Sequence, residues 1–381
     1  FKDDAVKAAE DVKWFPEWGK DRLQSMVKER ADWCISRQRK WGVPIPVVYC
    51  QDCGKEIIDN DIMMKVSKIF GEEGSDAWFA HDTEYFLPEG FKCPHCGSAK
   101  GFDKEKDIMD VWFDSGSSHA AVCARRKYLK VPADVYLEGA DQYRGWFQSS
   151  LLTSVAGGHG APYKQIITHG WTVDGEGKKM SKSLGNGIAP QEIISKYGAD
   201  ILRLWVASAD YHADIRISPE ILKQISDNYR KLRNTARYCL SNLYDFDPDK
   251  DMVSNDELEE LDKYALMKLD EVIKIARDAF EVYDYHTAAH SLHNFCVVEM
   301  SNFYFDVLKD RLYTSAPQSK TRRAAQTVLY KVLDALTLVL TPILAFTADE
   351  IWQSMPHDKS RNGESPLFNE IPQPDFIEAD S

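Results

Sequence analysis

The sequence has no apolar run long enough to cross a membrane. Its most apolar stretch, residues 335–348, is shorter than the roughly 20 residues that a spanning helix needs, and it contains Pro342. The opening residues carry no apolar stretch typical of a signal sequence, and no internal repeat or low-complexity tract occurs. We therefore expect a cytoplasmic protein in which residues 335–348 form a buried helix kinked at the proline.

The chain also lacks an excess of positive charge. Its 47 Lys and Arg residues against 60 Asp and Glu residues give a formal net charge of −13, so binding to nucleic acid would depend on local patches. Three basic groups occur: Arg37, Arg39 and Lys40; Arg125 to Lys127; and Lys320, Arg322 and Arg323. A further set, Arg230, Arg233 and Arg237, shares one face of a predicted helix. That spacing suits either a solvated face or a nucleic-acid backbone.

With 44% hydrophobic and 12% aromatic residues, the 381-residue chain is globular and long enough for two or three domains. Its first residue is Phe1 rather than methionine, so we expect a piece of a longer protein. The pattern changes near residue 218, from alternating strands and helices to helical periodicity alone. Strands are predicted at 43–49, 135–138 and 165–172, and helices at 142–156 and 190–207.

Such alternation predicts a parallel sheet with crossover helices. From Pro219 to Met355 the pattern predicts four or five amphipathic helices, interrupted near 245–255 and 314–319. The predicted fold class is therefore α/β followed by all-α. The stretch from His357, rich in Pro, Asp, Glu and Ser, is expected to be a loose linker.

Four of the eight cysteines form two Cys-x2-Cys pairs, each followed by a glycine that allows a tight turn. The ligands predicted for a tetrahedral zinc ion are Cys50, Cys53, Cys93 and Cys96. The stretch between the pairs is longer than usual, and His95 is an alternative ligand. Four thiolates leave no open coordination position, so the predicted zinc is structural.

The segment from Gly177 to Asn186 combines flanking glycines, three lysines and serine hydroxyls, a composition suited to a polyphosphate. A solvated surface loop is the plain alternative. Gly170 and Gly175 have the spacing of a P-loop, but Glu176 and Gly177 stand where Lys and Ser or Thr would be required. The segment is therefore no Walker site.

Polar residues follow two predicted strands. His169 and Gly170 end one strand, and Glu138, Gly139, Asp141 and Gln142 end another. Nucleotides bind at the carboxyl ends of strands in open parallel sheets. The carboxylates and the amide suit ribose hydroxyls and an amino group, although Asp141 would equally cap the following helix.

The Lys-Met-Ser-Lys-Ser run at 179–183 resembles the KMSKS signature of class I aminoacyl-tRNA synthetases. Three further blocks resemble the isoleucyl-tRNA synthetase family: Asp-Trp-Cys-Ile-Ser-Arg-Gln-Arg at 32–39 with Trp41-Gly42, Asp-Val-Trp-Phe-Asp-Ser-Gly at 110–116, and Tyr-Leu-Glu-Gly-Ala-Asp-Gln-Tyr-Arg-Gly-Trp at 136–146. The similarity extends from Trp14 to about Met355. Single motifs would leave the valyl and leucyl families open, whereas the combination favours isoleucine.

The resemblance implies ATP-dependent activation of L-isoleucine, with Mg²⁺, followed by transfer to tRNA(Ile). It implies that Lys179 and Lys182 are catalytic and close over the triphosphate. The residues that it places around ATP and the adenylate are Glu138, Gly139, Asp141, Gln142, His169, Gly170, Met180, Ser181 and Ser183. Trp112 and Trp146 would wall the isoleucine pocket, although a tryptophan by itself is more often a core residue.

The resemblance further implies that the helical part is an anticodon-binding bundle. Arg230, Arg233 and Arg237 would follow tRNA phosphates there, and Arg37, Arg39 and Lys40 would meet the acceptor end. The predicted domains are a return segment from an editing domain (1–32), the second half of a Rossmann-type catalytic domain (33–217) with a zinc insertion (50–104), the anticodon-binding domain (218–356) and the linker (357–381).

The chain departs from this family in one respect, because no His-Ile-Gly-His element occurs. We therefore expect a monomeric fragment that lacks the N-terminal half of the active site and has little activation activity alone. Two alternatives remain: a non-catalytic zinc-knuckle RNA-binding protein, and a different nucleotidyl-transferring ligase. The first does not explain the lysine loop, and the second does not explain the block around Trp112.

Overall fold

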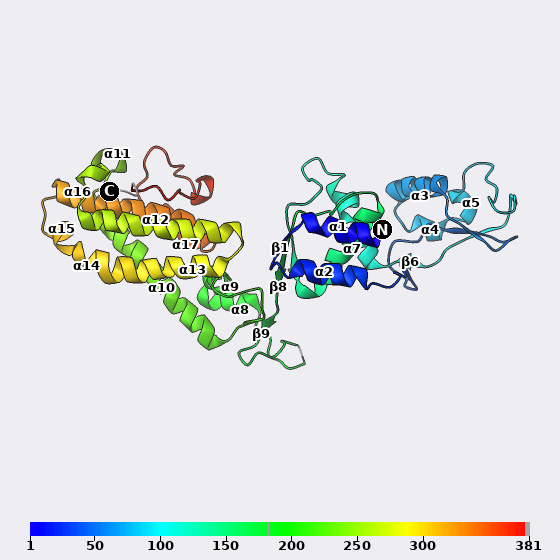
Figure 1. Ribbon diagram of the computed structural model, residues 1–381, viewed down its shortest axis with the longest axis horizontal. Coiled ribbons are helices and arrows are strands. Elements are labelled where there is room, and N and C mark those ends of the chain that lie inside the picture. The colour runs from blue at the N-terminus through cyan, green and yellow to red at the C-terminus, as the bar shows by residue number, and fades with distance from the viewer. Residues whose placement is uncertain (182, 378–381) are drawn as a thin grey trace. The chain divides into compact units, whose positions relative to one another are not determined.

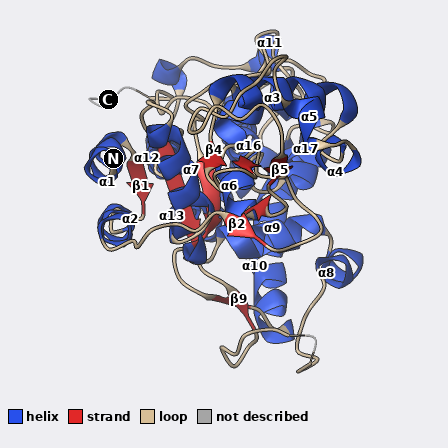
Figure 2. Ribbon diagram, turned by 90° about the vertical axis from the view of Figure 1, so that its right-hand side faces the viewer, coloured by secondary structure: helices blue, strands red, loops and turns tan. Residues whose placement is uncertain are grey.

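The computed structural model describes residues 1–181 and 183–377. The chain divides into two compact units, Phe1–Thr168 and His169–Ser381, which are described separately. Helices predominate and the strands are short (Figure 2). Among the described residues, no helix combines the length and the apolar composition that crossing a membrane requires.

The first unit is built around a three-stranded sheet in the order β1 (Lys13–Phe15), β8 (Gln165–His169), β7 (Tyr136–Gly139). β1 and β8 are parallel, with Trp14 opposite Ile166. Trp14, Tyr163 and Ile166 are buried with Phe147 of the helix α7 in one core. The other elements around this sheet are α1 (Lys2–Ala8), η1 (Ala9–Asp11), α2 (Gly19–Lys28), α6 (Val111–Gly116), η2 (His119–Cys123), η3 (Ala140–Tyr143) and α7 (Trp146–Ala156).

The cysteine-containing insertion has its own sheet and its own core. β3 (Val48–Cys50) lies between β4 (Glu56–Ile57) and β5 (Phe102–Lys104), antiparallel to both. Trp78, Phe86 and Ile62 are buried in its core. Its helices are α3 (Asn60–Glu73), α4 (Ala77–Ala80) and α5 (Thr83–Phe86). The antiparallel pair of β2 (Ser36–Arg37) and β6 (Ile108–Met109) flanks the insertion in sequence.

Two predictions for the first unit need correction, and one strand was missed. The run 43–49 is not a strand of the parallel sheet, because only its last two residues enter β3, which belongs to the insertion; Pro44 and Pro46 cannot donate ladder hydrogen bonds. The helix predicted at 142–156 is a 3-10 turn followed by α7. The strand β1 was missed, because three residues before Pro16 give too short a pattern.

The second unit begins with a two-stranded parallel sheet, β9 (Thr172–Val173) beside β10 (Ile215–Arg216). Helix α12 (Glu260–Glu281) packs against both α13 (Tyr285–Asn294) and α16 (Lys320–Leu340) (Figure 1). The helices of this unit are α8 (Pro190–Tyr197), α9 (Ala199–Ala207), α10 (Pro219–Asn242), α11 (Pro248–Asp251), η4 (Asn255–Glu257), α12 (Glu260–Glu281), α13 (Tyr285–Asn294), η5 (Phe295–Tyr304), α14 (Phe305–Val307), α15 (Lys309–Tyr313), α16 (Lys320–Leu340), α17 (Ala345–Trp352) and η6 (Pro366–Phe368).

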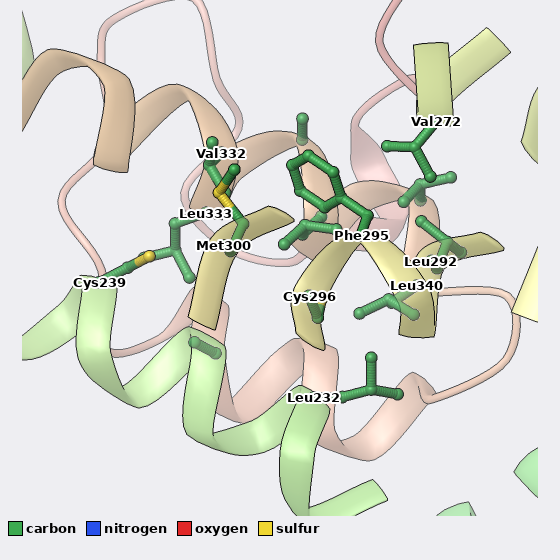
Figure 3. Packing of buried hydrophobic residues seen from close by; sticks show 14 of the residues in the cluster. Leu232, Cys239, Val272, Leu292, Phe295, Cys296, Met300, Val332, Leu333 and Leu340 are labelled. Atoms are coloured by element: carbon green, nitrogen blue, oxygen red, sulfur yellow. The ribbon is translucent and has the colours of Figure 1, made fainter. Parts of the chain in front are cut away.

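The bundle core is drawn from several of these helices. Figure 3 shows side chains converging from α10, α12, α13, η5 and α16: Leu232, Cys239, Val272, Leu292, Phe295, Cys296, Met300, Val332, Leu333 and Leu340. This packing confirms the predicted helical part. The predicted interruption near 245–255 lies between α10 and α12, and the one near 314–319 lies between α15 and α16.

Proline and glycine divide two helices that were predicted as single ones. Gly198, with φ 90°, separates α8 from α9. The apolar run 335–348 is not one kinked helix, because α16 ends at Leu340 and α17 begins at Ala345, with Pro342 between them.

Two predictions about charge and order in the second unit are also wrong. Arg322 and Arg323 are buried and pair with Asp245, so they form no surface patch. The segment from His357 is not loose over its described residues, because Arg361 pairs with Asp334 and Asp270 accepts hydrogen bonds from two backbone amides near Phe376.

A buried ion pair links α12 to α15. Asp262 is fully buried, and both of its carboxylate oxygens accept from Arg311, at 2.8 and 2.7 Å. The hydroxyl of Tyr304 donates to the same carboxylate at 2.5 Å. These bonds satisfy a charge that would otherwise be costly inside the bundle.

Candidate functional site: the lysine loop, strand ends and cysteine cluster

The segment from Gly177 to Asn186, called the lysine loop, follows β9 and is preceded by a tight turn. Oδ1 of Asp174 accepts from the backbone amides of Glu176 and Lys178, at 3.0 and 2.8 Å. Gly177 takes a φ of 84°, which favours glycine. Lys179 then forms an isolated antiparallel bridge with Val173, so the chain folds back beside β9.

Asn186 ties the far end of the loop to its beginning. Its Nδ2 donates to Oδ2 of Asp174 at 2.8 Å, and its Oδ1 accepts from the backbone amide of Ser181 at 3.0 Å. Nδ2 also lies 3.4 Å from the carbonyl oxygen of Lys179. The bond from Asn186 is the main cause that lowers the pKa of Asp174.

The lysines of the loop differ in their partners. Lys178 pairs with Glu176 at 2.7 Å, whereas the ammonium of Lys179 lies over the ring of Trp171, 5.7 Å from its centroid. Met180 packs partly buried against the bundle core. The hydroxyls of Ser181 and Ser183 lie 3.1 Å apart. Lys182, the other predicted catalytic lysine, lies outside the described residues.

His169 and Gly170 lie at the start of the second unit. The amide of Gly170 donates to the carbonyl of Tyr211, and Nδ1 of His169 lies 2.8 Å from the Gly170 oxygen. A Cβ at Gly170 would lie 2.4 Å from the backbone carbon and oxygen of Ala213. Glycine is therefore required here by the close approach of two backbones.

We expect Gly170→Ala to lower the free energy of unfolding by about 1–3 kcal/mol, because a backbone cannot move aside as a side chain can. The matched control is Gly187→Ala, whose added Cβ would meet nothing within 4 Å and which should change stability by less than about 0.5 kcal/mol. Urea unfolding followed by circular dichroism measures both. Equal stability of the two variants would contradict the close approach.

In the first unit, the end of β7 brings several predicted residues together. Both polar groups of the Gln142 side chain form hydrogen bonds within the protein. Its Oε1 accepts from the amide of Trp146 at 2.9 Å, and its Nε2 donates to Asp141 at 3.0 Å. Asp141 is exposed, Glu138 is half-buried and Gly139 is buried. The carboxylates of Glu138 and Asp141 are therefore both accessible, at least in part, to a ligand.

Trp112 and Trp146 both lie near this strand end. Trp146 stacks on Tyr136 with ring centroids 4.0 Å apart and donates its Nε1–H to the carbonyl of Ser115. A Cβ at Gly145 would lie 3.0 Å from the Trp112 ring. Trp112 is 41% exposed, so it is not an ordinary core residue.

The four predicted cysteine ligands converge. Their sulfur atoms all lie within 4.8 Å of one another, with Cys50 and Cys96 3.7 Å apart and Cys53 and Cys93 3.8 Å apart. Tetrahedral zinc with Zn–S bonds of about 2.3 Å requires sulfurs separated by about 3.8 Å. The two glycines after the pairs have φ values of 67° and 77°, as the tight turns require. The side chain of His95 instead contacts the carbonyl of Glu56.

Some of the predicted basic residues form ion pairs within the protein, and the others have exposed side chains. Arg37 pairs with Asp110 at 2.5 Å, and Arg233 pairs with Glu350 through two bonds of 2.7 and 2.5 Å. Arg230 pairs with Asp227 at the surface. The side chains of Arg39, Lys40 and Arg237 are exposed.

Sequence reasoning missed two contributors to the lysine loop. Trp171 was not singled out, although an aromatic residue after His-Gly is a visible signal. Asn186 was seen only as the end of the loop. Its pairing with Asp174 could have been suspected from the Asx residues that flank the lysines.

Comparison with known proteins supplies the family. The family model described as tRNA synthetases class I (I, L, M and V) matches residues 1–218, and the anticodon-binding domain of tRNA ligase matches residues 262–381. The isoleucine–tRNA ligase of Caldanaerobacter subterraneus subsp. tengcongensis is 58% identical over 373 residues, 98% of this chain and 40% of that protein. The isoleucine–tRNA ligase of Caldicellulosiruptor bescii is 59% identical over 355 residues, 93% of this chain and 38% of that protein.

Solved structures share the fold at low sequence identity. Mycobacterium tuberculosis methionyl-tRNA synthetase, in complex with methionyl-adenylate, is 20% identical with a TM-score of 0.66, over 92% of this chain and 60% of that chain. Agrobacterium radiobacter K84 agnB2 LeuRS, from a ternary complex with tRNA and LeuAMS, is 22% identical with a TM-score of 0.64, over 92% of this chain and 43% of that chain. The chain thus spans about 40% of the length of its curated relatives, and it belongs to the class I tRNA synthetase family.

Proposed function

We propose that this chain is part of a longer enzyme that activates L-isoleucine with ATP and transfers it to tRNA(Ile). The observation that carries this proposal is the 58% identity to an isoleucine–tRNA ligase over 98% of the chain. The isoleucine carboxylate would attack the α-phosphorus of ATP, which enters as its magnesium complex. The bond from that phosphorus to the bridging oxygen then breaks, and pyrophosphate leaves.

Such a reaction needs no covalent enzyme intermediate. The enzyme would therefore accelerate it by positioning the reactants and by stabilising the charge of the transition state. We assign the triphosphate to Lys179 and Lys182, with Met180 anchoring the loop and Ser181 and Ser183 offering hydroxyl donors. His169 and Gly170 would lie beside the adenine. Glu138, Gly139, Asp141 and Gln142 would hold the adenylate, and Trp112 and Trp146 would contact the isoleucine side chain.

The metal and tRNA assignments follow the same proposal. Cys50, Cys53, Cys93 and Cys96 would hold one Zn²⁺, whose role is to stabilise the fold because four thiolates close its coordination shell. The helices from residue 218 onward would bind the anticodon part of the tRNA, with Arg230, Arg233 and Arg237 meeting its phosphates. Arg37, Arg39 and Lys40 would meet the acceptor end. We propose a cytoplasmic, monomeric enzyme.

Exchange of label between pyrophosphate and ATP, dependent on amino acid, tests the reaction in the full-length enzyme. Isoleucine is expected to give the strongest exchange, ahead of valine and leucine. Lys179→Ala and Lys182→Ala should each lower kcat by about 10²–10³-fold, the usual cost of one transition-state donor. The matched control is Lys178→Ala, whose side chain pairs with Glu176 and should leave kcat within about twofold.

The same measurement distinguishes the alternatives. Exchange led by valine or leucine would assign the chain to another member of the family. No exchange by the full-length enzyme would favour a non-catalytic RNA-binding protein. The isolated chain, which lacks a His-Ile-Gly-His element, is expected to show little exchange, and substantial activity by it alone would contradict that expectation.

A further inference from the structure

Several described side chains of the lysine loop lie at the surface rather than in a core. Lys179 and Ser183 are exposed, and Ser181 is only half buried. Met180 packs against the bundle core, Lys179 forms a bridge with Val173, and backbone bonds close the two turns of the loop. The side chains that tie its beginning to its end are those of Asp174 and Asn186. We call this pair the Asp174–Asn186 clip.

The clip joins three separate parts of the loop. Asp174 fixes the turn before the lysines through two backbone amides, and its other oxygen accepts from Asn186 at 2.8 Å. Asn186 holds the amide of Ser181 at 3.0 Å and lies near the carbonyl of Lys179. One amide side chain therefore contacts the backbone on both sides of Met180.

The chemistry of the clip is that of a positioning device rather than of a substrate ligand. Both oxygens of Asp174 and both polar groups of Asn186 already have partners within the loop. Neither side chain is free to bind phosphate without giving up a bond. Each bond that the clip makes removes backbone freedom that the loop would otherwise have to lose when it meets a ligand.

We infer that Asp174 and Asn186 are positioning residues that order the lysine loop before ATP binds, so that the Lys179 ammonium is presented on a fixed backbone. This inference rests on the proposed function. The effect is expected on the activation step and on ATP, because the clip touches no residue that we assign to the isoleucine side chain.

Hydrogen exchange tests the clip in this chain alone. In Asn186→Ala, peptides covering 178–186 should exchange about tenfold faster, since the amide of Ser181 loses its acceptor and the turn loses one support. The control Glu176→Gln removes a loop charge that pairs with Lys178, and it should leave hydrogen exchange unchanged. Equal exchange in Asn186→Ala and the unaltered chain would overturn the inference.

A swap of the two side chains separates the hydrogen bond from general damage. Asn186→Asp sets two carboxylates against each other, and Asp174→Asn sets two amides against each other. The double variant Asp174→Asn/Asn186→Asp restores one donor opposite one acceptor, while both oxygens can still accept backbone amides. Exchange in the double variant should return to within about threefold of the unaltered chain. A double variant no better than the worse single variant would contradict the clip.

Kinetics in the full-length enzyme test the consequence for the reaction. Asn186→Ala should lower kcat for isoleucine-dependent exchange about 10–100-fold and raise the KM for ATP, with the KM for isoleucine within about twofold. The double swap should recover most of kcat. Unchanged kcat, or an equal change in both KM values, would overturn the positioning role. If the unaltered full-length enzyme shows no exchange between pyrophosphate and ATP, the proposed function fails and the role of the clip in activation fails with it. Hydrogen exchange still decides whether the clip orders the loop.

Discussion

If the four-cysteine site holds zinc as we propose, removal of the metal is expected to unfold the zinc insertion, residues 50–104, while the β1–β8–β7 sheet and the helical bundle stay folded. The strands of the insertion are only two or three residues long. Its core is separate from the cores of the sheet and the bundle. A unit of this size rarely has a core sufficient for stability without a metal or disulfides.

The expected loss of folding free energy on metal removal follows from the binding energy of structural zinc. Apparent binding free energies of about 10–16 kcal/mol in small zinc modules act directly as folding free energy, which exceeds what this small core would supply. Without the ion, four thiol groups would also remain crowded within 4.8 Å of one another. Loss of the insertion should therefore be cooperative rather than a local loosening.

Hydrogen exchange measured by mass spectrometry, with and without a strong chelator, follows each part separately. Peptides from α3 and β3 should lose protection, while peptides from α7 and α12 keep theirs. Cys53→Ser should reproduce the effect of the chelator. Cys34→Ser is the control, because Cys34 is exposed and lies outside the cluster. Absence of bound zinc in a folded protein, or unchanged protection after its removal, would refute the zinc assignment.

Replacement of Arg311 by methionine is expected to lower the free energy of unfolding of the bundle by about 3–5 kcal/mol. Methionine fills similar volume but leaves the Asp262 carboxylate fully buried without its cation. The hydroxyl of Tyr304 and one backbone amide would still donate to it, which reduces the loss but does not supply charge. The cost arises from an unpaired buried charge rather than from the absence of an attraction.

A second substitution distinguishes these two causes. Asp262→Asn combined with Arg311→Met removes the buried charge altogether, so the double variant should be more stable than Arg311→Met alone. Urea unfolding followed at 222 nm gives both values. Arg230→Met serves as the exposed control, because its pair with Asp227 lies at the surface and should be worth less than about 1 kcal/mol. Additive losses in the double variant would refute the explanation by buried charge.

The features that sequence predicts well here are those that local chemistry dictates. The spacing of Cys50 and Cys53 and of Cys93 and Cys96 needs only two tight turns, and the structure has both. The lysine loop is recognised by composition in the same way. The interruptions of the bundle are marked by polar and proline-containing segments between amphipathic helices.

The features that sequence could not supply depend on tertiary partners. Arg322 and Arg323 look like a surface patch until Asp245 is seen opposite them, across a long sequence separation. Arg233 likewise finds Glu350 only after the bundle has formed. The strand β1 has three residues, and its pairing with β8 is decided by the core around Trp14 rather than by its own pattern.

The pairing of β2 with β6 has a consequence for how the zinc insertion is attached. Arg37 lies opposite Ile108, so the chain leaves and re-enters this region of the fold at adjacent points. The segment between β2 and β6 is therefore an insertion whose two ends lie next to each other. The distance between these ends does not depend on the length of the insertion. Such an insertion can be shortened, lengthened or exchanged for another module without altering the path of the parallel strands, which makes it the natural place to graft a label or a binding domain.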